Sequence, residues 1–418
     1  MTDQATDTVE ITGHLMDSGI LSRVLNDIRD YGGDHVVERF DLGHHTDDTS
    51  YARIHVSAAD DESLQRMLMR LQTRGVNLVD PGEATVATAD RDGVFPEGFY
   101  STTNLETRVR FEGRWLRVDN PEMDCGLVVD TQAESGPRVY TIAMSDVRSG
   151  MVVVCGAAGV RVTTPLPAGG VDQGVFGFME SDVSSEKPQT LLVRQVADGM
   201  REARAAGKKV LWVGGPGVVH TGAAPAMVAM VNAGFVDVLF AGNALATHDI
   251  ESSLYGTSLG VDLAQGRGVE HGHEHHIRAL NTIRRAGSIA EAVDQGILTG
   301  GIMHALVTQD KPFVLVGSVR DDGPLPDVYT DVIEGQRAMR AGITDVGFCL
   351  MVATMLHSVA TGNILPASIP LVCVDINPAT VTKLADRGSS QARGIVTDVG
   401  LFLEQLAQEL IPTYTRPR

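Results

Sequence analysis

The sequence is poor in the features that mark several classes of protein. It has 4 cysteines in 418 residues, far apart and without a CxxC pair, so neither a disulfide framework nor a cysteine metal site is indicated. No apolar run approaches the roughly 18 residues that a membrane-spanning helix needs. The first residues are acidic, whereas a signal peptide begins with basic ones. We therefore expect a soluble, cytoplasmic protein that does not bind membranes.

Positive charge is also scarce. The chain has 34 lysines and arginines against 53 acidic residues, for a formal net charge of −19, and its basic residues are scattered. A nucleic-acid partner is therefore not expected. Only five of the basic residues are lysines, which limits Schiff-base chemistry to a few positions. These are Lys187, Lys208, Lys209, Lys311 and Lys383.

Residues 1–90 are predicted to form a ferredoxin-like α+β domain. Apolar residues recur at helical spacing over residues 20–28 and 64–71. Extended runs surround these two helices, at residues 9–11, 36–42, 51–56 and 76–79. The resulting order β-α-β-β-α-β is the ferredoxin-like plan. Such domains often bind amino acids or pair between subunits, and the fold alone decides neither.

Two further regions follow. Residues 91–185 carry short strand-like pieces punctuated by glycine and proline, which predicts a β-rich middle segment. Residues 186–418 alternate helical stretches with short, continuous apolar runs, as expected of a parallel sheet covered on both faces. These apolar runs are residues 210–213, 236–240, 313–316 and 371–374. The sequence thus predicts an α/β protein that ends in a parallel-sheet domain.

A glycine-rich segment follows the predicted strand at residues 210–213. It reads GGPGVVHTG and precedes a helix expected to start near Ala224. Glycines let the backbone approach a ligand, and free amides at a helix start favour an anion such as a pyrophosphate. The segment is not GxGxxG, and a tight turn without a ligand is the alternative. The candidate cofactor-binding residues are Gly215, Pro216, Gly217, His220, Thr221 and Gly222.

Acidic and amide side chains follow two other predicted strands of the same domain. Asn243, Asp249 and Glu251 come after the strand that ends near residue 240. Asp375 ends another strand, and Asn377 precedes the proline that starts the next helix. Parallel sheets bind their ligands at this edge, so all five residues are candidates for the hydroxyl groups of a dinucleotide. Capping of a helix is the alternative for Asp249.

The loop at residues 318–326 follows a third strand. Arg320 next to Asp321 and Asp322 suits a zwitterionic amino acid, because a guanidinium binds a carboxylate and a carboxylate binds an ammonium group. A surface ion pair in an Asp-Gly-Pro turn is the alternative. Arg117 is a second candidate for the carboxylate.

Two motifs of the middle segment carry polar side chains. Thr103 and Asn104 end the run YSTTN, and Asp124 is followed by Cys125. The first motif offers neutral hydrogen-bonding groups, and the second offers an acid beside a thiol. Turn chemistry alone explains either motif equally well.

The histidine-rich segment at residues 271–276 suggests a metal. It lacks the HExxH spacing, since Ile277 stands where the second histidine would fall, so no metal is predicted. His276 and Asn281 remain candidates for contact with a cofactor or substrate.

Five stretches of the sequence match a known family, at residues 13–19, 99–104, 317–326, 373–383 and 386–389. Over nearly its whole length the chain resembles this family, which is labelled "LOR/SDH bifunctional enzyme conserved region". Its members include archaeal-type, NAD-dependent ornithine cyclodeaminases and the C-terminal part of cyanobacterial arginine dihydrolase. The resemblance implies a Rossmann-like NAD domain similar to that of deoxyhypusine synthase, and self-association. Deoxyhypusine synthase uses a lysine in a Trp-Gly-Lys setting, which neither Trp115 nor Trp212 provides.

The function implied by this resemblance is conversion of L-ornithine to L-proline and ammonia, with NAD reduced and re-oxidised in each turnover. Asp124, Cys125 and Asp321 are then the expected catalytic residues, and Thr103, Asn104, Arg117, Arg320 and Asp322 the expected substrate contacts. An amino-acid or saccharopine-type dehydrogenase and a non-catalytic amino-acid sensor are the alternatives.

Overall fold

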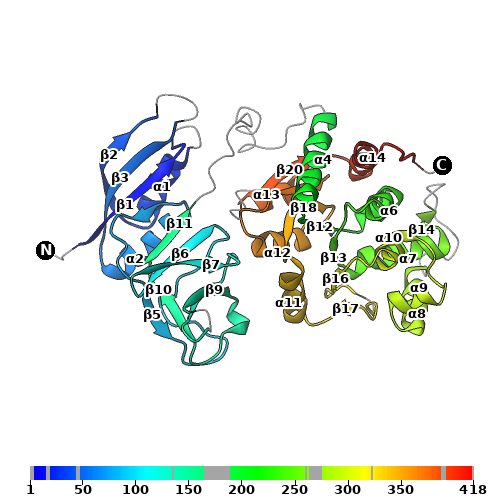
Figure 1. The fold of residues 1–418 in the computed structure, drawn as a ribbon, viewed down its shortest axis with the longest axis horizontal. Helices are drawn as coiled ribbons and strands as arrows, with labels where there is room; N and C mark the ends of the chain where they lie inside the picture. Colours follow the sequence, from blue (N-terminus) through cyan, green and yellow to red (C-terminus); the bar gives the residue numbers. More distant parts are fainter. Residues whose placement is uncertain are drawn as a thin grey trace. The chain divides into compact units, whose positions relative to one another are not determined.

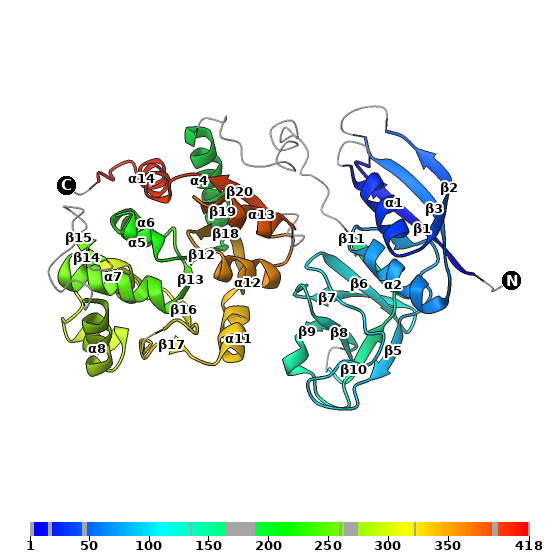
Figure 2. The same cartoon turned by 180° about the vertical axis from the view of Figure 1, so that it is seen from behind.

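The computed structural model describes most of the chain. It covers residues 4–15, 19–43, 48–133, 136–163, 189–258, 261–262, 275–321, 323–386 and 392–416. The chain divides into two compact units, one of Met1–Glu180 with Asn363–Ser368 and one of Ser181–Gly362 with Ile369–Arg418. Figures 1 and 2 show the elements of each unit from opposite sides. Within the covered ranges, no helix has both the length and the apolar character needed to cross a membrane.

The first unit begins with the predicted order of elements. These are β1 (Ala5–Gly13), α1 (Ile20–Asp30), β2 (Asp34–Asp41), β3 (Ser50–Ala58), α2 (Asp61–Gln72) and β4 (Asn77–Leu78). The strands pair antiparallel in the order β2-β3-β1-β4. Alternate residues of β3 are buried, since one face of this sheet packs against the helices. Asp60 caps α2 by accepting a hydrogen bond from the amide of Ser63.

A seven-stranded mixed sheet follows, in the order β11-β6-β7-β9-β8-β10-β5. Its strands are β5 (Thr85–Thr88), β6 (Glu106–Phe111), β7 (Arg114–Asp119), β8 (Gly126–Asp130), β9 (Arg138–Ile142), β10 (Val152–Cys155) and β11 (Val160–Thr163). The sheet curls, because the amide of Ala84, just before β5, donates to the carbonyl of Arg110 on β6. The predicted β-rich character is confirmed, while β5 and β11 were not expected.

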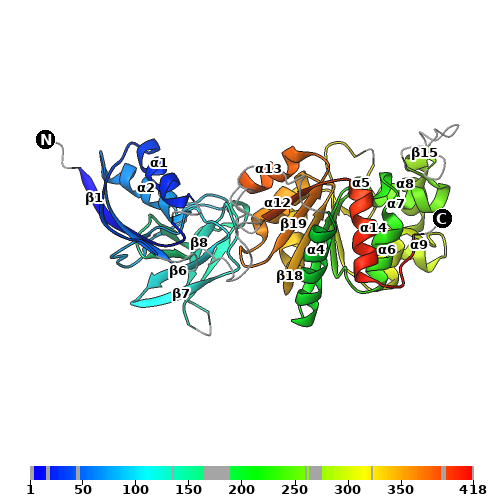
Figure 3. The ribbon, with the colours of Figure 1, turned by 90° about the horizontal axis from the view of Figure 1, so that it is seen from above.

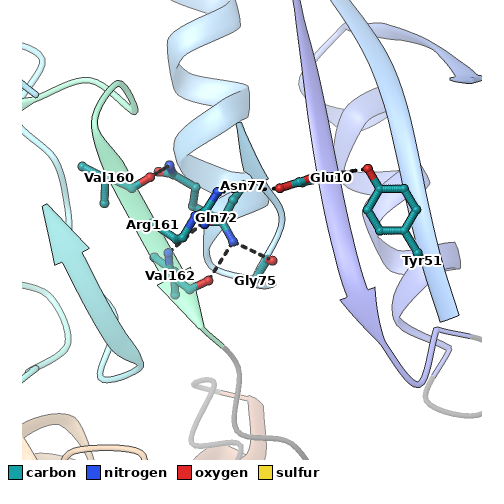
Figure 4. Close-up of polar contacts among 8 residues, drawn as sticks. All are labelled: Glu10, Tyr51, Gln72, Gly75, Asn77, Val160, Arg161 and Val162. Atoms are coloured by element: carbon teal, nitrogen blue, oxygen red, sulfur yellow. Dashed lines mark hydrogen bonds and ion pairs between the residues drawn. The ribbon is translucent and has the colours of Figure 1, made fainter. Parts of the chain in front are cut away.

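Polar side chains join these two sheets within the first unit (Figure 4). The amide of Gln72 at the end of α2 donates to the carbonyls of Ala157 and Val160, at 3.1 and 2.9 Å. Asn77 on β4 bonds Val162 on β11 twice, donating to its carbonyl and accepting from its amide. The N-terminal and middle regions therefore form one compact body.

The second unit is built on a seven-stranded parallel sheet, as predicted. The strand order is β17-β16-β13-β12-β18-β19-β20. The strands are β12 (Lys209–Gly214), β13 (Val238–Gly242), β16 (Phe313–Val316), β17 (Val328–Tyr329), β18 (Val346–Val352), β19 (Leu371–Asp375) and β20 (Ala392–Val396). Every neighbouring pair runs parallel. The central strands are buried almost throughout, which explains their continuous apolar sequence.

Helices cover both faces of this sheet, and Figure 3 shows α13 on one side and α4 on the other. The helices are α4 (Gln189–Ala205), α5 (Gly217–His220), α6 (Ala224–Asn232), α7 (Asn243–Tyr255), α8 (His275–Ala286), α9 (Ile289–Asp294), α10 (Gly301–Thr308), α11 (Val332–Gly342), α12 (Leu356–Ile364), α13 (Pro378–Asp386) and α14 (Val399–Leu410). A short hairpin of β14 (Thr257–Ser258) and β15 (Val261–Asp262) follows α7. One large apolar core lies between the helices and the sheet.

Candidate functional site

The parallel sheet has a switch point between β12 and β18. From β12 the chain adds β13, β16 and β17 on one side, then crosses back and adds β18, β19 and β20 on the other. Doubly wound sheets bind ligands outside the carboxyl ends of their strands at such a point. The loops that follow β12 and β18 are therefore the first place to look for a cofactor site.

These two loops are packed closely together. The amide of Gly215 donates to the carbonyl of Val352 at 2.9 Å. A Cβ atom on Gly215 would lie 1.8 Å from the carbonyl oxygen of Ala353, so only glycine fits there. Ala353 itself has φ +53°, in the left-handed region that residues other than glycine rarely adopt. Strained backbone of this kind gathers at functional sites.

The helix after β18 adds three polar side chains that were not expected from the sequence. His357 lies against the end of β13, since a Cβ atom on Gly242 would be 3.1 Å from its Cε1. Burial lowers the pKa of His357, while a hydrogen bond to the carbonyl of Val316 and the charge of Asp321 act to raise it. His357 therefore connects the ends of β13 and β16 and is mostly neutral near pH 7.

Ser358 and Thr361 stand one turn apart on α12 and are completely buried. Neither hydroxyl has a hydrogen-bond partner among the described residues. An unpaired buried hydroxyl costs about 1–3 kcal/mol, so the pair is suited to bond a polar ligand. Residues 346–352 are not among the strands predicted from the sequence, although their apolar run VGFCLMV carries the signal.

The predicted glycine-rich segment forms the turn from β12 into α5. Gly215, Pro216 and Gly217 lie at the end of the strand, directly beside the loop after β18. The polar atoms of His220 and Thr221 both bond other groups of the protein. His220 Nδ1 lies 2.6 Å from Ser258 Oγ, and Thr221 Oγ1 donates to the carbonyl of Gly217. Gly222, with φ +74°, closes the turn before α6.

The three predicted residues on α7 are all engaged by neighbouring groups. Asn243 Oδ1 accepts hydrogen bonds from the amide of Leu325 and from Thr247, at 3.0 and 3.3 Å. Asp249 accepts from the amides of Ile302 and Met303, both at 2.8 Å, and so holds the start of α10. These contacts favour the capping interpretation of Asp249 over the ribose interpretation.

Glu251 belongs to a buried network of histidine and hydroxyl groups. Its carboxylate bonds His248 Nδ1 at 2.8 Å and accepts from Thr257 at 2.9 Å. The Thr257 hydroxyl also lies 2.8 Å from His275 Nδ1. Burial and the nearby His248 lower the pKa of His220, whose ring lies 4.8 Å from that of His248. The carboxylate of Glu251 is thus bonded within the helical layer, to His248 on its own helix and to Thr257 after it.

The histidine-rich segment lies mostly outside the described residues. Residues 271–274 belong to that part, while His275 and His276 begin α8. The ring of His276 lies 6.4 Å from that of His248. In the described ranges, no three histidine, cysteine or acidic side chains are arranged to hold a metal ion.

The remaining predicted residues of this unit lie at the ends of β16 and β19. Asp375 is buried at the end of β19 and accepts a hydrogen bond from the amide of Asn377. Asn377 in turn accepts from Ala379 at the start of α13. Asp321 accepts from the amide of Ser318, and Arg320 beside it is exposed. Asp322 lies outside the described residues.

Thr102 brings the two motifs of the middle segment together in the first unit. Its hydroxyl donates to the carbonyl of Glu122 at 2.5 Å, and the same oxygen accepts from the amide of Cys125 at 3.0 Å. The amide of Asp124 donates to the carbonyl of Thr102. Asp124 has φ +60° and an exposed side chain, while Cys125 is 2% exposed. The carboxylate of Asp124 therefore lies at the surface, whereas the thiol of Cys125 lies in the interior.

The neighbouring Asn104 is almost completely buried. Its Nδ2 donates to the carbonyl of Leu365 at 3.0 Å, while its Oδ1 has no partner among the described residues. Thr103 Oγ1 accepts a long hydrogen bond from Leu105. Arg117 is exposed on β7, across from Arg108 on β6.

Comparison with known proteins identifies the family. Three family descriptions match successive parts of the chain. "LOR/SDH bifunctional enzyme conserved region" covers residues 6–105, and "Arginine dihydrolase ArgZ-like, C-terminal, first region" covers 106–193. "Arginine dihydrolase ArgZ-like, C-terminal, Rossmann fold" covers 194–406. The ornithine cyclodeaminase of Methanothermobacter thermautotrophicus is 51% identical over 96% of this chain and 97% of its own. The chain belongs to the archaeal ornithine cyclodeaminase family.

Solved structures of this family share the fold of the chain. The apo structure of ArgZ, a cyanobacterial arginine dihydrolase, has a TM-score of 0.85 at 35% identity, covering 98% of this chain and 59% of its own. A ternary complex of AgrE with ornithine and NAD⁺ has a TM-score of 0.52 at 40% identity, covering 98% of this chain and 58% of its own. The chain thus spans somewhat more than half of these longer relatives.

Proposed function

We propose that the protein is an ornithine cyclodeaminase, which converts L-ornithine to L-proline and ammonia with bound NAD. The observation that carries this proposal is the 51% identity to an ornithine cyclodeaminase over almost the whole of both chains. The AgrE complex contains both ornithine and NAD⁺, at 40% identity to this chain. The architecture of the second unit supports it independently, since its switch point carries the groups that a dinucleotide needs.

Residues of the second unit suit NAD at this switch point. The chemistry that NAD supplies when bound is removal of a hydride from Cα of ornithine and its return to the ring formed after ammonia leaves. Gly215 and Gly217 keep the loop after β12 close to the loop after β18. Ser358 and Thr361 offer buried hydroxyls without partners, and Asp375 offers a carboxylate at the end of β19. We assign these five residues to cofactor binding.

The substrate must first be held by its α-carboxylate. Arg320 is the first choice, because its exposed guanidinium lies on the loop after β16, and Arg117 is the second. Asp321, through its bond to the amide of Ser318, fixes the conformation of this loop. Thr103 and Asn104, with the unpaired Oδ1 of Asn104, are proposed to bond the amino groups.

Protons must also be accepted from the amines. An alkyl amine has a pKa of about 10.4. Removing its proton at neutral pH therefore costs roughly 4–5 kcal/mol of free energy. Asp124 is the proposed acceptor, since it combines an exposed carboxylate with a left-handed backbone that holds it beside Thr102. Asp321 and Asp322 are alternatives, and Cys125 is proposed to lie near the reacting carbon.

The finer description of the protein is also a proposal. We assign the N-terminal part to the ferredoxin-like plan and the NAD domain to the type found in deoxyhypusine synthase. Domain limits of 1–90, 91–185 and 186–418, a cytoplasmic location and self-association into a homo-oligomer stay predictions. The antiparallel strand order of the N-terminal sheet is consistent with the ferredoxin-like plan.

An incubation with L-ornithine and a small amount of NAD⁺ tests the proposed function. We expect proline and ammonia in equal amounts, far above the NAD⁺ supplied, without lasting NADH absorbance. NADH that accumulates in step with ornithine loss would instead indicate an amino-acid or saccharopine-type dehydrogenase. Ornithine binding without turnover would indicate a sensor.

A further inference from the structure

We infer that β2 is a docking edge at which two copies of this chain pair strand against strand. One side of β2 is hydrogen-bonded to β3 from Asp34 to Asp41. Among the described residues no strand pairs along its other side, so β2 ends the sheet β2-β3-β1-β4 (Figure 1). An unpaired edge of this length is a template for another strand.

The side chains along this edge are unusually exposed, and three of the eight are apolar. Seven of the eight residues of β2 are exposed, including Val36 and Phe40 at 61% and 38%. Lysine and proline are common protections of an exposed edge, and β2 carries neither, although charged residues alternate with its apolar ones. The other exposed apolar residues around it are Tyr31, Val37 and Leu42.

The charges of β2 are complementary to those of the same strand in a second copy. Arg39 and Asp41 form an ion pair on one face, and Phe40 between them points to the opposite face. In an antiparallel pair centred on Phe40, Arg39 of each copy lies across from Asp41 of the other. The two Phe40 rings meet at the twofold axis. Opposite charges and aromatic residues across strands stabilise a sheet.

The three registers centred on the charged residues next to Phe40 are unfavourable, which favours the register centred on Phe40 over them. Centring the pair on Arg39 places two guanidinium groups opposite each other, and centring it on Asp41 places two carboxylates opposite each other. Centring on Glu38 does the same with two glutamates, at a position where the pairing of β2 with β3 is already irregular. Like charges directly across a ladder are destabilising. The occupant proposed is therefore a second copy in this register, related by a twofold axis.

Two charge-reversal variants test the proposal. Arg39→Asp alone leaves only acids at these two positions, and Asp41→Arg alone leaves only arginines. Each variant should weaken self-association at least about tenfold, because both cross-strand pairs become repulsive. Mixing the two variants should restore a complex that contains one copy of each, measured by native mass spectrometry. The ion pair within the strand is broken in both variants, so only pairing between copies explains such rescue.

A disulfide provides a second readout. The described cysteines are all buried, so Phe40→Cys adds an accessible thiol at the twofold axis. Directly opposed residues of an antiparallel pair have Cα atoms about 4.5–5.5 Å apart, which suits a disulfide. Oxidation should give a covalent dimer, whereas Leu401→Cys, at an exposed position of α14, should give far less.

Three results would overturn the proposal. The first is a mixture of Arg39→Asp and Asp41→Arg that associates no better than either variant alone. The second is a parent protein whose self-association neither variant changes. The third is a parent protein that stays monomeric at every concentration, since no pairing of β2 between copies then occurs.

Discussion

Asp249 shows how one buried side chain links the sequence to the stability of the fold. Its two oxygens hold the first amides of α10, and its neighbour Gly301 has φ +91° and no room for a Cβ atom. Burial raises the pKa of Asp249 to about 6, against the opposing effect of the two backbone hydrogen bonds. The carboxyl is therefore a structural group that titrates close to neutrality.

The raised pKa of Asp249 predicts that this group stabilises the fold less as the pH rises. Its contribution is fully present below the ordinary pKa of 3.8 and is lost through about 6. A shift of about two pH units corresponds to roughly 3 kcal/mol. Urea unfolding of the parent and of Asp249→Asn at pH 4.5 and 7.5 measures the difference in their free energies of unfolding. The parent should lose stability relative to the variant between these values, and an unchanged difference would contradict the assignment.

Asp124 is the residue on which the proposed proton transfer depends. Asp124→Asn keeps the left-handed backbone, which asparagine tolerates, but removes the base. We expect proline formation to fall about 10²–10⁴-fold, as for loss of a general base. The matched control is Asp310→Asn, since Asp310 is also exposed with φ +51° but follows α10. A rate for Asp124→Asn within about threefold of the parent would exclude Asp124 as the base.

At the scale of elements, the turn after β12 depends on glycine. Gly215→Ala forces a Cβ atom against the carbonyl of Ala353 and separates the loops after β12 and β18. We expect a lower melting temperature and at least about tenfold weaker NAD⁺ binding by calorimetry. Gly300→Ala is the control, because its nearest contact would be 3.4 Å from Ser253 Oγ and its backbone is extended. Equal NAD⁺ affinity in both variants would refute the assignment of this turn.

Removing a buried hydroxyl of α12 should keep or raise the stability of the protein and weaken its binding of NAD⁺. Thr361→Val replaces an unpaired buried hydroxyl with a methyl group of similar shape. The protein without ligand should be as stable as the parent or more stable, since an unsatisfied polar group is removed. NAD⁺ binding should weaken by about fivefold or more, for a lost hydrogen bond of about 1 kcal/mol. Parallel loss of stability and affinity would indicate a purely structural role.

Sequence patterns were sufficient to predict helices and strands whose buried residues recur at a regular spacing or form a continuous apolar run. Helix α2 follows from apolar residues three and four apart in residues 64–71, and the structure adds a cap by Asp60. The parallel strands β12, β13, β16 and β19 follow from continuous apolar runs. The two-residue strand β17, by contrast, is defined by its pairing with β16, which a local pattern does not contain.

The site was harder to predict, because its residues are defined by the order of strands in the sheet. The glycine turn after β12 was recognisable from composition. Its partner loop after β18 was not, since β18 becomes the neighbour of β12 only through the crossover from β17. For the same reason His357, Ser358 and Thr361 carried no local signal. Asp249 and Glu251 looked like ligands in the sequence, but their oxygens bond neighbouring elements.

At the scale of the whole molecule, both compact units belong to a chain with one enzyme activity. Family resemblance extends from residue 6 to residue 406 in three consecutive parts, so both units belong to the same inherited enzyme. The first unit supplies the cluster around Thr102 and Asp124, and the second supplies the switch point with its glycine turn.

The most direct test follows the hydrogen on Cα of ornithine. The protein is incubated with L-ornithine deuterated at Cα and a small amount of unlabelled NAD⁺, and the proline formed is analysed by mass spectrometry and NMR. The account predicts that proline keeps the deuterium at Cα, because the same hydrogen is removed and returned within one turnover. Deuterium that collects in NADH, or that is lost to water, would contradict the claim that this protein is a cyclodeaminase with an internal redox cycle.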